Sequence, residues 1–349
     1  MNVRRLLFQV PYLAVTVTLG LNGPGSLAAQ LDVHALPNWV TPYTVKGELS
    51  WSNLWWVEAR FQGSSESGAR WAELMQWVGA RRREQTEAIR GEFGRAGVSA
   101  NALAEGCYDD DACQLITDID SLVARFPEEF PNFQRLITAA REATPAIEGF
   151  RLAVQTAWHV ASMDHVSVAE RLHAALICDQ AYMIAITGFK YAEREPPALP
   201  GSALELFYFG LRNEMRKQNR ANVDFVKEWV INKGWPKHSD VGDAGESAMW
   251  LIVQHADQDP VFQYRMLGKM GALVANGQAS AKDQAYLYDR VMLKLNGKQR
   301  YGTQLTCKDG SLVPRSLEEP RDQLDAYRKV AGLPPISEYL RGFTSSCAR

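Results

Sequence analysis

"SAKDQAYLYDRVMLKLNGKQRYGTQLTCKDGSLVP", residues 280–314, decides the fold class, because it joins a helical pattern to a hairpin pattern. Ser280 is followed three residues later by Asp283, which resembles a capping box at a helix start. Apolar residues then occur on nearly every side of the expected helix, which is typical of a buried one. We therefore predict a helix over residues 281–296.

The second half of this stretch predicts a β-hairpin. Two short extended runs flank Asp309 and Gly310, a favoured pair for a tight hairpin turn. Pro314 marks an exposed edge or a strand end, because proline cannot donate a ladder hydrogen bond. This is the one substantial non-helical region that the sequence indicates.

Helical periodicity extends outward from this stretch over most of the chain. Asp259 before Pro260 is typical of an N-cap followed by proline at the first helical position. Helices are predicted at about 48–61, 68–93, 114–126, 132–163, 166–193, 202–233, 243–257 and 260–276. The predicted fold class is mainly α, a multi-helix, bundle-like array with one small carboxyl-terminal β-hairpin. Among the many tryptophans, which usually form core, Trp56 and Trp77 are candidates for lining a groove.

The amino terminus has the layout of a secretory signal peptide. Arg4 and Arg5 precede a mostly apolar stretch, and cleavage after Ala28 leaves small residues at the two positions that matter. The stretch falls short of the roughly 20 apolar residues that span a bilayer. We therefore expect a periplasmic or secreted protein with residues 1–28 removed and no integral membrane segment in the mature chain.

Length and charge bound the class of protein. The 349 residues, 46% of them hydrophobic, suffice for a sizeable core and suggest a helical region at 29–165 followed by a second unit at 166–349. Without Arg4 and Arg5, the 38 basic residues become 36 against 40 acidic ones, a net charge of −4. A nucleic-acid partner is not expected from this balance.

The five cysteines fit an exported protein, which can keep disulfides. In "CYDDDAC", Cys107 and Cys113 are spaced to close a small loop around three aspartates. Those aspartates either bind calcium or form a clamped acidic turn that caps the following helix. Pairing of Cys307 with Cys347 would tie the tail to the body, which leaves Cys178 as a buried free thiol.

Common cofactor and nucleophile motifs are missing from the chain. It has no GxGxxG, no phosphate loop, no HExxH and no nucleophile elbow. We therefore expect no cofactor and no metal ion.

Polar residues that interrupt apolar segments are the candidate site residues. They are Asp179 with Gln180, His255, Asp289 with Arg290, and the group of Gln299, Tyr301 and Gln304. His255 shares a helix face with Leu251 and Ile252, so its ring needs a hydrogen-bond partner. Asp257 lies about 200° around the same helix and belongs with Asp259 to the turn that follows.

The same positions carry a resemblance to a known family. The matching motifs, in order, are Asp179 and Gln180, Asn222, Gly234 to Pro236, Gln254 to Asp257, Asp289 and Arg290, Gln299, Tyr301 to Gln304, Pro314, Asp325, Arg328, and Gly332 to Pro335. Over about residues 178–340 the chain resembles an uncharacterised bacterial family, a domain of unknown function. The resemblance supplies candidate positions and implies no reaction.

An enzyme is one interpretation of these residues. His255 would act as general acid or base, tuned by Asp289 or Asp179. Arg290 would hold an anionic group, and Tyr301 or Gln304 would stabilise developing charge. The candidate substrate-binding residues are Asp179, Gln180, Gln299 and Gln304. With no evident serine or cysteine nucleophile, activated water would attack a polar or anionic envelope substrate, and the partners of His255 are expected roughly thirty to fifty residues downstream.

Two other interpretations stay open. The polar residues can form a buried hydrogen-bonded network that fixes the packing of the helices against the hairpin. Alternatively, the protein is a binding module that holds a small molecule, peptide, glycan or partner protein without turnover. Its oligomeric state is not indicated by the sequence.

Overall fold

The computed structural model describes residues 34–63, 66–161, 163, 167–190, 195–318 and 320–342. The predicted signal peptide, residues 1–28, and Cys347 lie outside the described residues. All the described residues belong to one compact unit. The predicted boundary near residue 165 falls at residues that the structure does not describe, and it stays a prediction.

The architecture is an array of helices with one hairpin, as predicted. The 3₁₀ helices are η1 (Asn38–Tyr43), η2 (Trp55–Phe61) and η3 (Arg321–Gln323). The α-helices are α1 (Glu66–Arg95), α2 (Asp111–Arg125), α3 (Phe133–Ala161), α4 (Val168–Lys190), α5 (Gly201–Lys233), α6 (His238–Gln254), α7 (Pro260–Val274), α8 (Ala281–Asn296), α9 (Leu324–Val330) and α10 (Ile336–Arg341). The hairpin consists of β1 (Leu305–Lys308) and β2 (Ser311–Pro314).

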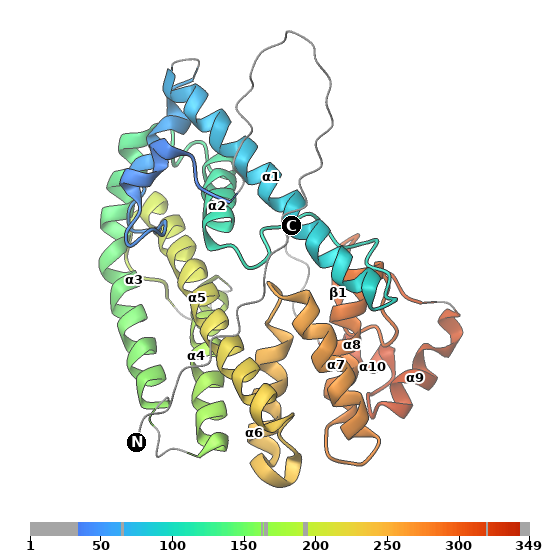
Figure 1. Cartoon of the computed structure of the whole chain (residues 1–349). Coiled ribbons are helices and arrows are strands. Elements are labelled where there is room, and N and C mark those ends of the chain that lie inside the picture. The colour runs from blue at the N-terminus through green and yellow to red at the C-terminus, as the bar shows by residue number, and fades with distance from the viewer. Residues whose placement is uncertain are drawn as a thin grey trace, which may run out of the picture. The chain divides into compact units, whose positions relative to one another are not determined.

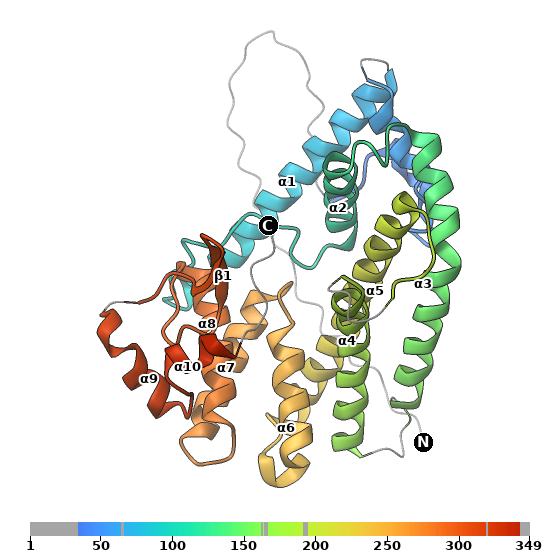
Figure 2. The same ribbon diagram turned by 180° about the vertical axis from the view of Figure 1, so that it is seen from behind.

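The long helices lie side by side. Figure 1 shows α3, α4 and α5 together, with α6, α7 and α8 continuing the array, and Figure 2 shows the same array from behind. α4 packs against α3, α5 and α6, and α1 crosses the array to contact both α2 and α7. The face of α4 that carries Asp179 is therefore covered by neighbouring helices.

Two large buried clusters form most of the core, with a third, small one at Ala285, Ala331 and Leu333, and α5 contributes to both large clusters. The first gathers residues from η1 to the start of α5, with Trp51 and Leu211 among its members. The second runs from the end of α1 to α8 and includes Val226 and Leu287. Trp77, expected as a possible groove residue, is only 3% exposed and belongs to the first cluster.

Local signals place the helix ends near the predicted positions. Asp259 caps α7 by accepting from the Phe262 N–H at 2.8 Å, and Pro260 occupies its first turn. Ser280 caps α8 by accepting from the Asp283 N–H at 3.2 Å. The backbone N–H of Ser280 donates to Glu246 in α6, so this cap is completed by another helix.

The hairpin has the predicted turn. Asp309 and Gly310 both have positive φ, 50° and 76°, as a tight hairpin turn requires. Pro314 pairs with Leu305 at the end of the antiparallel ladder.

The helix predicted over residues 48–61 is wrong for its first half. Only the 3₁₀ helix η2 forms there, because small polar side chains bond locally and compete with helical hydrogen bonds. Ser50 and Ser52 bond each other at 2.8 Å, and the Asn53 side chain donates to the Tyr43 carbonyl at 2.9 Å. Residues 44–54 therefore form a tight link between η1 and η2.

A separate finding concerns membranes. Within the part of the chain that the structure describes, each helix is too short or too polar to cross a bilayer.

Candidate functional site

A histidine and a buried carboxylate meet between α4 and α6. His255 is the C-cap of α6, and its Nδ1 lies 2.7 Å from Oδ2 and 2.9 Å from Oδ1 of Asp179. An ionised carboxylate can only accept hydrogen bonds, so Nδ1 is the protonated nitrogen that donates. The ring is thereby held in one orientation, with Nε2 left as the acceptor nitrogen.

Asp179 is enclosed by donors from three helices. Its side chain is 1% exposed in the middle of α4, a helix that is apolar on nearly every side. The Gln180 amide donates to Oδ2 from the same helix. The Asn219 amide of α5, oriented with its nitrogen toward Asp179, donates to Oδ1 at 3.0 Å. The negative charge is therefore held by side chains from α4, α5 and α6.

The His255 side chain also lines a solvent-open depression. The side chain is 18% exposed, and among the described residues nothing hydrogen-bonds to its Nε2. The depression contains about 300 Å³ of empty space, counted to its open mouth. It is lined by Asp109, Asn219, Arg220, Val223, Asp224, Lys227, His255, Ala256, Gln258 and Asp259.

Ion pairs hold the cations of this depression in place. Arg220 donates to Asp109, to Asp111 at 2.9 Å and to Gln258 at 3.3 Å. Burial lowers the pKa of the Arg220 guanidinium, but Asp111 and Asp109 more than offset this, so the pKa is raised and the group stays charged. Lys227 pairs with Asp259 at 2.8 Å. The walls of the depression are therefore preorganised by contacts that reach from the disulfide loop to α7.

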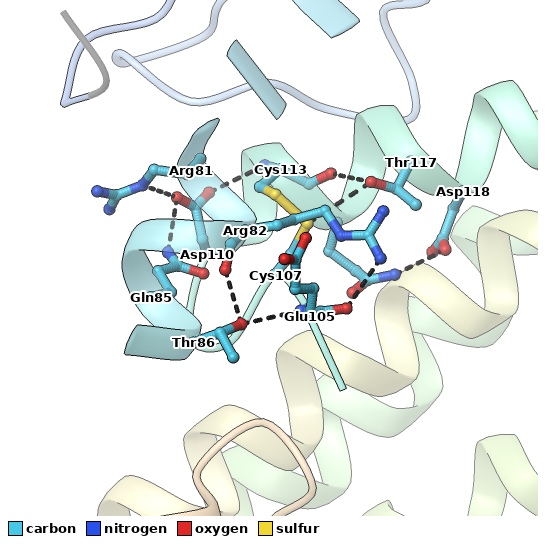
Figure 3. Close-up of a disulfide and its surroundings, with 12 residues drawn as sticks. Arg81, Arg82, Gln85, Thr86, Glu105, Cys107, Asp110, Cys113, Thr117 and Asp118 are labelled. Carbon is cyan, nitrogen blue, oxygen red and sulfur yellow. Dashed lines mark hydrogen bonds and ion pairs between the residues drawn. A yellow bond between two sulfur atoms is a disulfide. The ribbon is translucent and has the colours of Figure 1, made fainter. Parts of the chain in front are cut away.

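The disulfide loop is tied to this wall. Cys107 and Cys113 are bonded, as predicted, and Figure 3 shows Asp110 beside them, in contact with α1 and with the start of α2. Asp110 accepts from the Cys113 N–H at 2.9 Å and from Arg81 Nε at 2.6 Å. The three aspartates of "CYDDDAC" thus cap α2 or pair with arginines, which favours the clamped acidic turn over a calcium site.

Of the other cysteines, Cys178 has a defined state. Cys178 is a free thiol, 1% exposed, as predicted. Burial and the charge of neighbouring Asp179 raise the pKa of this thiol to about 11, so it is unreactive at neutral pH. The pairing of Cys307 with Cys347 stays a prediction, because Cys347 lies outside the described residues.

Arg290 belongs to a different cluster from His255. Its Nε donates to Asp257 Oδ1 at 3.0 Å, and Lys294 Nζ donates to the same oxygen at 2.8 Å. Burial raises the pKa of Asp257, but the charges and hydrogen bonds of Lys294 and Arg290 outweigh it and hold this pKa far below its usual value. Asp257 therefore joins α8 to the turn after α6, and Arg290 already has an anionic partner.

Asp289 fixes the loop between α8 and the hairpin. Its side chain is fully buried, and its two oxygens accept from the N–H groups of Arg300, Tyr301 and Thr303 at 2.8 to 2.9 Å. The Thr303 hydroxyl donates to the same carboxylate at 2.9 Å. Both oxygens are therefore saturated by residues 300–303, a structural role.

The predicted glutamines and Tyr301 serve the same loop. The Gln299 side chain donates to the carbonyls of Gln304 and Arg315 and accepts from the Gln304 N–H. The Tyr301 ring packs edge-on against Tyr288, with centroids 5.7 Å apart. Among the described residues, no hydrogen bond connects these side chains to His255.

The structure therefore divides the predicted site residues. It brings His255, Asp179 and Gln180 together, and it places Asp289, Gln299, Tyr301 and Gln304 around the hairpin loop. The hydrogen-bond partner of His255 lies 76 positions upstream, where thirty to fifty positions downstream was expected. Asn219, Arg220 and Lys227 were not predicted as site residues, because as polar residues of a long amphipathic helix they carry no distinguishing sequence signal.

Metal ligands are not grouped at this site. Within the described ranges, no three or more His, Cys, Asp and Glu side chains are arranged to hold a metal ion.

Comparison with known proteins concerns the carboxyl-terminal part of the chain. Residues 208–347 match the model of a family described as "Family of unknown function (DUF6624)". No curated protein and no solved structure matches the chain. The matched range contains His255 and the hairpin loop, whereas Asp179 and the disulfide loop precede it. The carboxyl-terminal part therefore resembles a domain of unknown function, as its motifs predicted.

Proposed function

We propose that the protein is an enzyme in which His255 acts as a general acid and base, supported by Asp179. The observation that carries this proposal is the arrangement of the two ring edges. Nδ1 is held at 2.7 Å by a carboxylate that is 1% exposed, while the ring itself is 18% exposed at the wall of a depression. An oriented imidazole that solvent can reach is the arrangement that general acid–base catalysis requires.

The chemistry follows from this tautomer. Nε2 takes a proton from a substrate hydroxyl, a substrate amine or a water molecule, and Asp179 stabilises the imidazolium that forms. The same Nε2–H then returns the proton to the leaving group. The lining contains no serine, threonine or cysteine, so water is the nucleophile in a hydrolytic version of the reaction.

Charges at the depression indicate the class of substrate. The lining holds two basic residues, Arg220 and Lys227, and three acidic ones, Asp109, Asp224 and Asp259. Both basic groups are paired, and Asp179 adds a further negative charge behind the ring. We therefore assign a neutral or cationic polar substrate. The anionic substrate expected through Arg290 is not supported, since that guanidinium is bound to Asp257.

Activity on a chromogenic panel tests the proposal. The panel contains p-nitrophenyl acetate, neutral p-nitrophenyl glycosides, p-nitroanilides of neutral and basic amino acids, and p-nitrophenyl phosphate as the anionic comparison. We expect turnover of a neutral or cationic member, and a loss of kcat/KM of about 100-fold or more in His255→Gln.

A second histidine provides the matched control. His238 also bonds a buried carboxylate, with its Nδ1 3.1 Å from Glu246 Oε2, but it lies outside the depression. His238→Gln is expected to keep the wild-type kcat/KM. The proposal fails if His255→Gln retains full activity, or if no substrate turns over while a ligand stabilises wild type and His255→Gln equally. That second result would favour a binding module.

Export is a further part of the proposal. It is supported by the Arg4 and Arg5 leader pattern and by the Cys107–Cys113 disulfide, which fits an oxidising compartment. Mass spectrometry of the protein from fractionated cells should find a mature chain that begins at Ala29 outside the cytoplasm. An intact amino terminus in the cytoplasmic fraction would contradict export.

A further inference from the structure

A second depression lies far along the chain from His255, in the segment that precedes α1. It is lined by residues of η1, η2 and the start of α1, which are drawn in blue in Figure 1. Four of its lining residues are aromatic: Trp39, Tyr43, Trp55 and Trp56. The depression contains about 260 Å³ of empty space, counted to its open mouth.

Trp55 is the exposed ring of this depression. All ten tryptophans are among the described residues, and Trp55 is the one that is exposed, at 45%. Its ring meets Phe133 of α3 edge-on, with centroids 5.4 Å apart. This contact fixes the orientation of the Trp55 ring and leaves part of its aromatic surface available to a ligand.

The depression is supported by rigid contacts on its inner side. Val57 of η2 is fully buried, and Arg60 bonds Asp120 of α2 at 2.7 Å. Trp56, whose ring stacks with that of Trp71 at 6.1 Å, is only 1% exposed and supports the depression as a core residue, not as an open groove residue. The shape is therefore preformed, which lowers the entropic cost of binding.

Planar polar groups complete the lining. Glu58 and Gln62 contribute a carboxylate and an amide, and Arg70 contributes a guanidinium that also donates to Glu66 at 3.2 Å. Such groups bond pairs of neighbouring hydroxyls, because each carries two donors or acceptors in one plane. Glu58 and Arg70 have opposite charges, so the depression favours a neutral ligand over a phosphate or a peptide terminus.

We infer that this depression binds a neutral saccharide, with one sugar ring stacked on Trp55 and its hydroxyls bonded by Glu58, Gln62 and Arg70. The apolar C–H face of a pyranose matches an aromatic ring, and its hydroxyls match the polar rim. A proline-rich peptide also binds aromatic surfaces, but it requires a longer groove and few hydrogen-bonding groups. The inference is independent of the acid–base role of His255.

Isothermal titration calorimetry on the full chain tests the inference. The probes are cellotetraose, maltotetraose and the tetramer of N-acetylglucosamine, with a proline decamer as the competing ligand class. We expect at least one sugar to bind with a Kd of about 1 mM or tighter. Trp55→Ala should weaken that binding about tenfold or more. Glu58→Gln should weaken it a few-fold, which corresponds to roughly 0.5–1 kcal/mol because a tenfold change in Kd is about 1.4 kcal/mol.

Trp158→Ala is the matched control. Trp158 is half-buried and also meets a phenylalanine edge-on, at 6.0 Å from Phe225, but it does not line the depression. The Trp158→Ala variant should bind the sugar with a Kd within about twofold of the wild-type value, and so should His255→Gln. The inference is overturned if no sugar binds, if Trp55→Ala and Glu58→Gln bind like wild type, if His255→Gln abolishes binding, or if only the proline decamer binds.

Discussion

Asp179 and Asp289 are two buried aspartates in apolar helices, and the structure gives them opposite roles. All the donors to Asp289 come from residues 300–303, which follow it closely in the chain, and three of them are backbone N–H groups. The donors to Asp179 are side chains, and one of them is the partly exposed ring of His255. A carboxylate saturated by backbone groups fixes a loop, whereas one that holds an imidazole can direct proton transfer.

Removing the Asp289 carboxylate should have the largest effect on stability. Asp289→Ala leaves three backbone N–H groups and the Thr303 hydroxyl without an acceptor, so the free energy of unfolding should fall by about 4 kcal/mol. Urea denaturation followed by circular dichroism measures the change. A loss below about 1 kcal/mol would show that water replaces the carboxylate, and the contrast with Asp179 would weaken.

Opening the disulfide should have the next largest effect. Cys107 and Cys113 are six positions apart, and the loop-entropy relation for such a loop gives about 2 kcal/mol. The double variant Cys107→Ser/Cys113→Ser should lose this amount of unfolding free energy by urea denaturation. The double variant should also weaken the ion pairs of Asp109 and Asp111 with Arg220, and so lower the affinity of any ligand that binds in the His255 depression. An unchanged ligand affinity would show that the disulfide loop does not support the His255 site.

Asp179→Asn should change the chemistry of His255 more than the fold. We expect the free energy of unfolding to fall by about 1.5 kcal/mol, because the side chain keeps its size but no longer offers a charged acceptor. In wild type, nitrogen NMR at pH above the histidine titration should show the proton on Nδ1. In the variant, a substantial share of the molecules should carry this proton on Nε2 instead. An unchanged tautomer would contradict the orienting role of Asp179.

Asp257→Asn should have the smallest effect, and its effect should depend on pH. The Asp257 side chain is 46% exposed, so solvent screens its ion pairs with Arg290 and Lys294. The free energy of unfolding at pH 7 should therefore fall by about 0.7 kcal/mol in the variant. Because the folded-state pKa of Asp257 is depressed, its contribution is complete above the unfolded value of about 3.9. It is lost as the pH falls from there through the folded-state pKa.

Comparison of the two proteins by urea denaturation across pH checks this sign. The difference in unfolding free energy between wild type and Asp257→Asn should be constant from pH 7 to about 5 and should shrink below about pH 4. A difference that grows as the pH falls would contradict the ion-pair role.

Much of the fold was predictable because its signals are local. The Asp259 cap, the Asp309–Gly310 turn and the spacing of Cys107 and Cys113 each act within a few residues, and each prediction is confirmed. The helix predicted at 48–61 was wrong because Ser50, Ser52 and Asn53 form local side-chain bonds that periodicity does not reveal.

The candidate site was only partly predictable, since its hydrogen-bond partners are far apart in the chain. His255 and Asp179 were both recognised as polar insertions, but their pairing depends on the packing of α4 against α6. Asp289 and Arg290, adjacent in sequence, point to different partners, residues 300–303 and Asp257. Adjacent residues on a helix point about 100° apart, so sequence proximity does not imply a shared site.

The sequence by itself determined the helices, their caps, the hairpin turn and the need of each buried polar group for a partner, since these follow from short-range sterics and hydrogen bonding. Only the tertiary structure decided which partner each group received. The packing of α4 against its neighbours brought Asp179 to His255, and the array of α5, α6 and the disulfide loop left the His255 ring partly exposed at a solvent-open depression. Packing between distant segments makes that choice, because it alone sets which side chains share a buried space.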